Sequence, residues 1–310
     1  MRSSLLKSSL LTLSTAALVA SCATAPKMMM EDGTEYDVAA QYEKFAEVDM
    51  NPDTSFLSAV VNKLIDASDY LSQIYLLQRG VNYPELRQEI ARNGSDAQLT
   101  MFDLHYGPCD SLESDFVFYG EAECPEGGGF YPRDMTRQEF EDWIAAHPED
   151  EDAFTSGYTV IRRTDDGGLK AVPYHVEYAE YLKPAAQLMR EAADLSENEN
   201  LTRFLNLRAD AFLTDDYFES EMAWMDLDGD IEVAIGPYEV YDDGLFGYKT
   251  AYESFVTIKN PEESAALAKY KNYLRDMEAN LPVEESYKNF SRGFASPIAV
   301  TYQVHGGGDN

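Results

Sequence analysis

The segment at residues 224–255 constrains the fold of this 310-residue chain most, because it predicts two adjacent β-strands. A short apolar run at 231–235 is stopped by Gly236-Pro237, and a second β-prone run ends at 255–258. The polar step Glu239-Val240-Tyr241 lies between them. The sequence therefore places a carboxylate and a phenol at the end of a strand, where binding groups often sit on a rigid frame. A structural turn with its tyrosine in the core is the alternative interpretation.

Residues 1–22 are typical of a signal peptide, with two basic residues near the start and an apolar stretch at 10–19. The stretch is too short to span a bilayer. A cysteine directly after a small-residue site resembles a bacterial lipobox, so we expect Cys22 to be lipidated and residues 23–40 to form a tether. The mature protein would then be exported and lipid-anchored to a membrane, facing the periplasm. An ordinary secretory signal that contains a cysteine is the alternative.

The formal net charge of −32 excludes nucleic acid as a partner, because each phosphate contact would work against the field of the protein. The same charge argues against direct binding of anionic lipid headgroups. Solubility is the favoured explanation for so acidic a surface.

Two further cysteines, Cys109 and Cys124, are close enough in sequence to close a short loop. In an oxidising compartment we expect them to form a disulfide that stabilises the fold by about 3 kcal/mol. Two unrelated buried thiols are the alternative, because sequence does not reveal the geometry that a bridge requires.

Residues 41–310 contain no internal repeat or clear linker, and they predict one α+β unit. Apolar spacing and start or stop signals define its elements. In chain order these are a helix over 56–74 closed by Gly80, a short helix ended by Asn93-Gly94, loops and short strands over 101–132, a helix opened by a capping box at Thr136 and Glu139, a hairpin over 158–172, mostly helices over 174–225, a helix over 260–281 and a final strand over 296–304.

No short motif for a metal, a phosphate or an activated nucleophile occurs in the chain. No two histidines lie three to five residues apart, and none is in an H-E-x-x-H motif. We therefore predict no metal site in this chain and expect hydrogen-bonding or surface roles for the histidines, which are His105, His147, His175 and His305.

The run at 235–255, I-G-P-Y-E-V-Y-D-D-x-L-F-G-Y-K-x-x-Y-E-x-F, resembles the bacterial branch of the dipeptidyl-peptidase III family of zinc metallopeptidases. The resemblance implies one lobe of a two-lobed fold, in which helices pack around a small, mainly antiparallel sheet or barrel. Glu239 and Tyr241 would lie at one side of a cleft. Further segments fit the same family in order: Tyr106-Gly107-Pro108, Phe130-Tyr131-Pro132, residues 158–163, Arg208-Ala209-Asp210 and Asp215-Asp216-Tyr217.

The resemblance also implies roles for two residues. Glu239 would bind the free N-terminal amine of a peptide substrate, since a carboxylate pairs with an ammonium through charge-assisted hydrogen bonds. Tyr241 would be catalytic, because its phenol would stabilise the oxyanion that forms when zinc-bound water attacks the scissile carbonyl. The following Asp242-Asp243-Gly244 differs from the eukaryotic pattern, which bears on the shape of the amine pocket.

In the family, a zinc helix with H-E-x-x-G-H follows the strand that resembles 296–300, whereas this sequence ends at 306–310. We therefore expect the N-terminal part of such a peptidase, with substrate-side residues, no zinc in this chain and no activity alone. The missing C-terminal half could reflect a truncated gene, a separately encoded partner or a non-catalytic remnant. The competing hypothesis is a peptide-binding or interaction lipoprotein that never catalyses.

Overall fold

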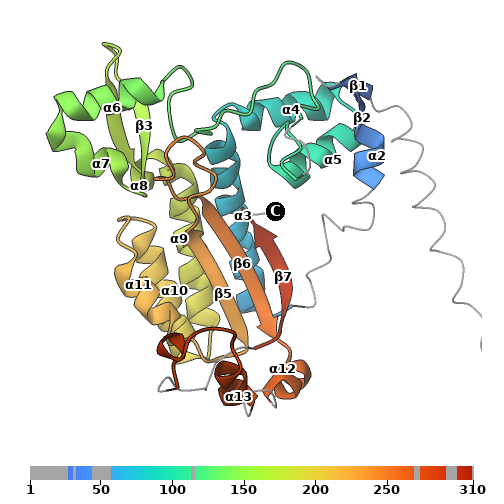
Figure 1. The fold of residues 1–310 in the computed structure, drawn as a ribbon, viewed down its shortest axis with the longest axis vertical. Helices are drawn as coiled ribbons and strands as arrows, with labels where there is room; N and C mark the ends of the chain where they lie inside the picture. The colour runs from blue at the N-terminus through green and yellow to red at the C-terminus, as the bar shows by residue number, and fades with distance from the viewer. Residues whose placement is uncertain are drawn as a thin grey trace, which may run out of the picture.

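The two strands predicted from the central segment form, and a third strand completes an antiparallel sheet (Figure 1). The strands are β5 (Ile231–Pro237), β6 (Tyr252–Lys259) and β7 (Thr301–Gly307), in the order β5-β6-β7. Among the described residues the sheet does not close on itself, so the α+β class is confirmed and the barrel alternative is wrong. The computed structural model describes residues 27–30, 33–43, 57–112, 116–268, 273–290 and 299–308.

The first predicted helix is confirmed as α3 (Ala59–Arg79), which lies behind the sheet in Figure 1 and packs against β6. The Ser58 side chain caps it by accepting a hydrogen bond from a backbone amide of the first turn, and Gly80 follows its last residue. The apolar spacing gives α3 one buried face. The buried apolar residues of this face are Val61, Leu64, Ala67, Leu71, Ile74 and Tyr75, whereas Leu76 packs into a second, separate core.

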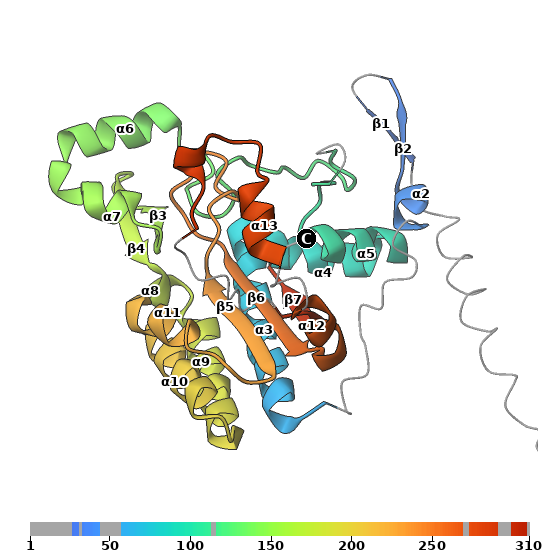
Figure 2. The ribbon, with the colours of Figure 1, turned by 60° about the horizontal axis from the view of Figure 1, so that its bottom comes forward.

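The helical region predicted over 174–225 is also confirmed, and it forms a layer beside the sheet (Figure 2). In this layer α9 (179–195) packs against α3, α10 (199–211) packs against α9, and α11 (218–224) packs against α10. Trp224 at the end of the fourth helix donates its indole N–H to the Val233 carbonyl of β5, 3.0 Å away, so it covers part of that strand's outer edge. The helices are α8 (Tyr174–Glu177), α9 (Ala179–Leu195), α10 (Glu199–Ala211) and α11 (Phe218–Trp224).

The predicted hairpin is confirmed, but the capping box before it forms only in part. The Thr136 hydroxyl accepts from the Glu139 amide at 3.1 Å. The Glu139 carboxylate instead accepts from the Arg163 guanidinium at 2.5 and 3.0 Å. This ion pair replaces the reciprocal capping bond because charge-assisted bonds are the stronger ones. The elements of this region are α6 (Arg137–Ala146), α7 (Glu151–Thr155), β3 (Thr159–Arg163) and β4 (Leu169–Pro173).

Residues 23–40 are expected to be a tether, and the structure differs over the described part of this range. Tyr36 and Val38 are fully buried, and the Tyr36 hydroxyl donates to the Asp110 carboxylate at 2.7 Å. These two apolar side chains attach the segment to the body because burying each of them is worth about 1.5–3 kcal/mol. The elements formed here are β1 (Lys27–Met29), β2 (Glu35–Asp37) and α2 (Val38–Glu43).

Two helices support this N-terminal segment. The short helix predicted before Gly94 is confirmed as α4 (Tyr83–Asn93). The loops and strands predicted from residue 101 begin later, because a capping box between Ser95 and Gln98 starts α5 (Asp96–His105). The N-terminal segment and these two helices share a second hydrophobic core, separate from the one against the sheet. Its buried side chains are Tyr36, Val38, Leu76, Tyr83, Ile90, Ala97, Met101, Phe102 and Phe118.

The helix predicted over 260–281 is not seen as one element. The structure has α12 (Pro261–Ala268) and α13 (Leu274–Ala279), and residues 269–272 lie outside the described part. Met277 is 58 % exposed, so the apolar spacing over α13 does not correspond to a buried face here.

The last strand begins later than predicted and runs further. The expected range is 296–304, of which 296–298 lie outside the described residues, whereas β7 continues through Gly307. A Cβ at position 307 would lie 2.4 Å from the Ser72 hydroxyl of α3, so this glycine allows close packing within a strand. Within the described part of the chain, no helix has both the length and the hydrophobicity needed to cross a membrane.

Candidate functional site

Near the end of β5, a glycine packs against a buried arginine. Arg208 of α10 is fully buried, and its Nη1 donates to the Ile235 carbonyl at 2.8 Å and to the Tyr238 hydroxyl at 2.9 Å. Its Nη2 donates to Glu221 at 2.5 Å. Gly236 has φ of +151°, and a Cβ there would lie 2.4 Å from Arg208 Nη1. Only glycine fits this position of β5, one residue before the strand ends.

A buried carboxylate organises the middle of the connection. Asp243 is 3 % exposed, and it accepts a hydrogen bond from the Tyr131 hydroxyl at 2.7 Å. Burial and the nearby Asp243 carboxylate raise the pKa of Tyr131, so the phenol stays protonated and donates. Four backbone amides, those of Leu245, Phe246, Tyr248 and Lys249, also donate to this carboxylate at 2.9–3.1 Å. Five donors compensate for desolvation of the charge and hold the loop in one shape.

The preceding carboxylate, Asp242, ties the connection to α3. Its side chain is 2 % exposed, and it accepts from Arg79 Nη1 at 2.6 Å and from the Tyr75 hydroxyl at 3.1 Å. Burial and Asp242 raise the pKa of Tyr75, which keeps this donor protonated. Asp242 and Asp243 therefore bind different parts of the structure. Together they fix the position of the residues just before them, 239–241.

Lys249 fixes the end of the connection against α7 and β3. The side chain is fully buried, and Nζ donates to the carbonyls of Phe154 and Ser156 at 2.5 and 2.9 Å and to the Thr159 hydroxyl at 2.9 Å. Three acceptors match the three N–H groups of an ammonium. Burial lowers the pKa of Lys249 to about 7, although Asp243 opposes the shift.

The residues between these anchors are exposed. Glu239, Val240 and Tyr241 face solvent, and the Tyr241 ring is 56 % exposed. The Glu239 carbonyl accepts from the Ala251 amide at 2.8 Å, so its backbone continues the pairing of β5 and β6. The structure thus places the two predicted site residues on one rigid, accessible segment, where a carboxylate and a phenol could contact a bound molecule.

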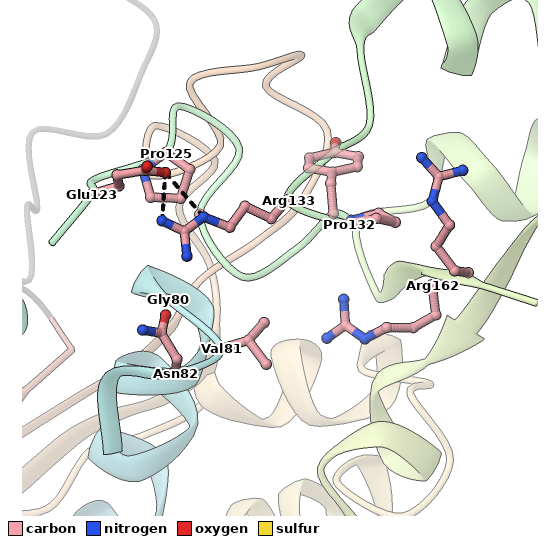
Figure 3. Close-up of a pocket in the computed structure, with 11 residues that line it drawn as sticks. Gly80, Val81, Asn82, Glu123, Pro125, Pro132, Arg133 and Arg162 are labelled. Carbon is pink, nitrogen blue, oxygen red and sulfur yellow. Dashed lines mark hydrogen bonds and ion pairs between the residues drawn. The ribbon is translucent and has the colours of Figure 1, made fainter. Parts of the chain in front are cut away.

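The structure also has a cavity, but the two predicted residues do not line it. The cavity lies between the end of α3, the loop at 123–133 and the end of β3 (Figure 3). Gly80 in its lining follows Arg79, which binds Asp242. Tyr131 in its lining donates to Asp243. This cavity is therefore not the cleft expected beside Glu239 and Tyr241, because the buried contacts of Asp242 and Asp243 separate the two.

Comparison with known proteins identifies the family. The family model described as peptidase family M49 matches residues 135–299, which is more than half of the chain and includes the β5–β6 connection. The chain belongs to peptidase family M49. The predicted resemblance to dipeptidyl-peptidase III is confirmed by this match and by solved structures with similar folds.

Two of those structures are dipeptidyl-peptidases III. The one from Caldithrix abyssi is 46 % identical with a TM-score of 0.77, and the match covers 87 % of this chain and 53 % of that one. The one from Corallococcus sp. strain EGB is 36 % identical with a TM-score of 0.75, over 88 % of this chain and 52 % of that one. The α+β arrangement therefore matches a lobe of dipeptidyl-peptidase III, and the chain spans about half the length of these relatives.

A plant protein is similar over the same share of the chain. Nudix hydrolase 3 of Arabidopsis thaliana is 28 % identical over 327 residues, which cover 87 % of this chain and 42 % of the plant protein.

Family M49 enzymes are in general zinc-dependent, and the described residues do not by themselves fit a zinc site. Among them, no three or more histidine, cysteine, aspartate or glutamate side chains are grouped so that they could hold a metal ion. His175 binds Asp215 with 2.7 Å between Nδ1 and Oδ2, and His147 contacts the Trp143 carbonyl at 3.0 Å. These two histidines have the hydrogen-bonding roles that the sequence predicts.

The remaining predicted site residues are cysteines. Cys109 and Cys124 are joined by a disulfide, with 6.5 Å between their Cα atoms. Tyr83 of α4 donates its hydroxyl to the Glu123 carbonyl at 2.9 Å, next to this bridge. Cys22 lies outside the described residues.

Sequence reasoning missed the residues that position this M49 loop. Asp242 and Asp243 read as a polar turn, yet both carboxylates are buried and bonded to other elements. Their partners Arg79 and Tyr131 are more than 100 positions away in the sequence, so spacing gives no sign of the pairing. The available signal was Lys249, which lies three residues before a position that is buried in a strand. A lysine so close to the core has to find acceptors for its ammonium group.

Proposed function

We propose that this chain acts as the substrate-binding lobe of a dipeptidyl-peptidase III-like zinc metallopeptidase, which releases dipeptides from the N-termini of peptides. The observation that carries the proposal is the exposed Glu239 carboxylate on a loop anchored by buried charges. Membership of family M49 supports the reaction class. Zinc and the groups that hold it would come from outside the described residues.

Glu239 would bind the N-terminal ammonium of the peptide, and Tyr241 would donate its phenolic hydrogen to a carbonyl oxygen of the same peptide. Both side chains are exposed, so solvent weakens the charge pairing in this lobe alone. An exposed ion pair is worth up to about 1 kcal/mol, or about fivefold in affinity. In a desolvated pocket the same ion pair would change the affinity about ten- to hundredfold. That larger effect requires a second protein surface that covers the peptide and excludes water.

Calorimetry with a short peptide and its N-acetylated form tests the amine role. The 310-residue chain should bind the free amine about two- to fivefold more tightly, and Glu239→Gln should remove the difference. Glu219→Gln removes the same charge from an exposed position of α11 and serves as the matched control. Equal affinities for the two peptides in the unmodified chain would reject an amine site at Glu239.

The alternative function is peptide binding without catalysis by an interaction lipoprotein. Both hypotheses predict amine-dependent binding, so the discriminating measurement is dipeptide release. We expect no release and no stoichiometric zinc for the chain alone. Release after addition of the part of Caldithrix abyssi dipeptidyl-peptidase III that this chain does not match would favour the peptidase, and a persistent lack of release would favour the binding lipoprotein.

We also propose that the protein is exported and anchored to a bacterial membrane through a lipid on Cys22, facing the periplasm. The motif before Cys22 supports this proposal. Labelling with a fatty-acid analogue should mark the wild-type chain and place it in the membrane fraction. Cys22→Ala should remove both the label and the membrane association, whereas a soluble, unlabelled wild-type product would refute the anchor.

A further inference from the structure

The cavity next to the anchored loop has an apolar wall. Its volume is about 320 Å³, at the lower end of the range for small-molecule sites, which is roughly 300–1,000 Å³. Val81 lines it and is 55 % exposed, so an apolar side chain faces an open concave surface. The full lining is Gly80, Val81, Asn82, Glu123, Pro125, Gly128, Tyr131, Pro132, Arg133, Arg162 and Arg163.

Two of the three lining arginines are committed to the fold. Arg162 donates Nε and Nη2 to Glu177 at 2.9 and 2.6 Å, and its Nη1 to the carbonyls of Gly129 and Ile161 at 3.0 and 2.9 Å. Arg163 forms ion pairs with Asp134, which precedes α6, and with Glu139 in the first turn of α6. These two guanidinium groups are therefore fixed parts of the cavity wall. A ligand that bound them would have to break hydrogen bonds that stabilise the fold.

The third arginine has an exchangeable partner. Arg133 donates Nε to Glu123 Oε2 at 3.0 Å, and the two side chains are 57 % and 66 % exposed. Figure 3 shows Arg133 extended along the mouth of the cavity toward Glu123. An exposed pair of this kind contributes little net stability. A ligand carboxylate that also buries apolar surface on Val81 would therefore displace Glu123 from Arg133.

A second polar group lines the same cavity. Asn82 lines the cavity at the start of α4, and its side chain makes no capping hydrogen bond there. Its side-chain amide can donate to an acceptor on a molecule bound in the cavity. At −32, the net charge repels anions in general, so a carboxylate would be retained only where such local donors accompany apolar contact.

We propose that this cavity binds an apolar, preferably aromatic, group that carries a carboxylate. The ring would contact Val81 and the Tyr131 side, and the carboxylate would take the place of Glu123 on Arg133. The C-terminal residue of a peptide and a free small aromatic acid share this chemistry. The site contains neither Glu239 nor Tyr241, so it stands apart from the proposed amine role.

The test uses the 310-residue chain and probes that have no free amine. N-acetyl-phenylalanine should bind about tenfold more tightly than N-acetyl-phenylalaninamide, which lacks the carboxylate, and more tightly than N-acetyl-alanine, which lacks the ring. Equal binding of the acid and its amide would overturn the proposal. Comparison with 3-phenylpropionate separates the two sources: equal affinity indicates a free aromatic acid, and weaker binding indicates a peptide C-terminus.

Two substitutions at the exposed pair act in opposite directions. Glu123→Gln should raise the affinity for N-acetyl-phenylalanine several-fold, about three- to tenfold, because it removes the competing carboxylate. Arg133→Gln should abolish the preference for the acid over the amide. Arg203→Gln is the matched control, because Arg203 forms a similarly exposed pair with Asp226 elsewhere.

A third substitution tests the apolar wall. Val81 is exposed, so Val81→Asp should fold normally, while its charge and lost apolar area should weaken acid binding about tenfold. Unchanged affinity in both Arg133→Gln and Val81→Asp would show that the probe binds elsewhere and would overturn the assignment.

Discussion

At the scale of single residues, three buried charges decide the shape of the exposed loop. Arg208 and Lys249 are fully buried, and Asp243 is 3 % exposed. Each makes at least three hydrogen bonds, and those of Asp243 and Lys249 go mostly to backbone groups, which compensates for the loss of hydration. Removing one of these side chains would leave its polar partners without a hydrogen bond, which costs about 1–3 kcal/mol for each partner that stays buried.

Gly236→Ala should destabilise the protein through this network. The added methyl group would overlap Arg208, and the backbone angle at this position is one that alanine avoids, so we expect a loss of about 3 kcal/mol. Gly247→Ala on the same loop is the control, with φ of +71° and no atom within 4 Å of the added Cβ, and it should cost about 1 kcal/mol. Urea unfolding of both variants measures the difference, and equal losses would contradict the role of Arg208.

Lys249 should make stability depend on pH. Its pKa is lowered to about 7 in the folded protein, below the ordinary value of 10.5, so the unfolded chain binds more protons between these values. The free energy of unfolding should therefore rise by about 1 kcal/mol per pH unit from pH 7 to 10 and gain nothing from this group below pH 7. Lys249→Met should lose that slope. Parallel slopes in the two proteins would show that the lysine does not titrate in this window.

At the scale of elements, local patterns in the sequence predict most helices and strands, and long-range contacts explain the errors. The strand pair β5–β6 follows from apolar runs and a Gly-Pro stop, and the helix α3 follows from apolar spacing and the closing Gly80. The extension of β7 over Gly307 does not, because Gly307 pairs with Ser254 of β6 at a point where α3 leaves no room for a side chain. The folded part of the expected tether likewise depends on Tyr36 reaching Asp110.

The site follows the same division. Glu239 and Tyr241 are predicted from a motif and are exposed as a binding role requires. The residues that hold them in place, such as Arg79 and Tyr131, come from distant segments that no local pattern connects. Sequence therefore indicates which groups could act, and tertiary contacts decide how rigidly they are presented.

The disulfide should stabilise the loop that leads into the cavity. Cys109 and Cys124 are separated by 15 positions, and closing a loop of this length is worth about 3 kcal/mol. Reduction should lower the free energy of unfolding by about that amount, measured in urea with and without reductant. A Cys109→Ser, Cys124→Ser double variant should match the reduced protein and ignore the reductant. An unchanged wild-type midpoint would show that the bridge adds no stability.

At the scale of the whole molecule, the chain supplies about half of the length of the dipeptidyl-peptidases III that it matches. Its described part has a small open sheet, helices on one side of it and an exposed loop with a carboxylate and a phenol. This arrangement supports the proposed binding of a peptide. The proposed peptidase reaction also requires zinc, for which the described residues offer no group of ligands.

The central claim, that Glu239 binds a peptide ammonium, is tested most directly by the pH dependence of peptide affinity. The α-amino group of a short model peptide has a pKa of about 7.7–8.0, so it loses its proton in this range. Affinity should therefore fall about two- to fivefold between pH 6.5 and 9.5, as the ammonium becomes an amine. The N-acetylated peptide should show no such fall, and neither should Glu239→Gln with the free peptide. A wild-type affinity that is the same at both pH values would contradict the account.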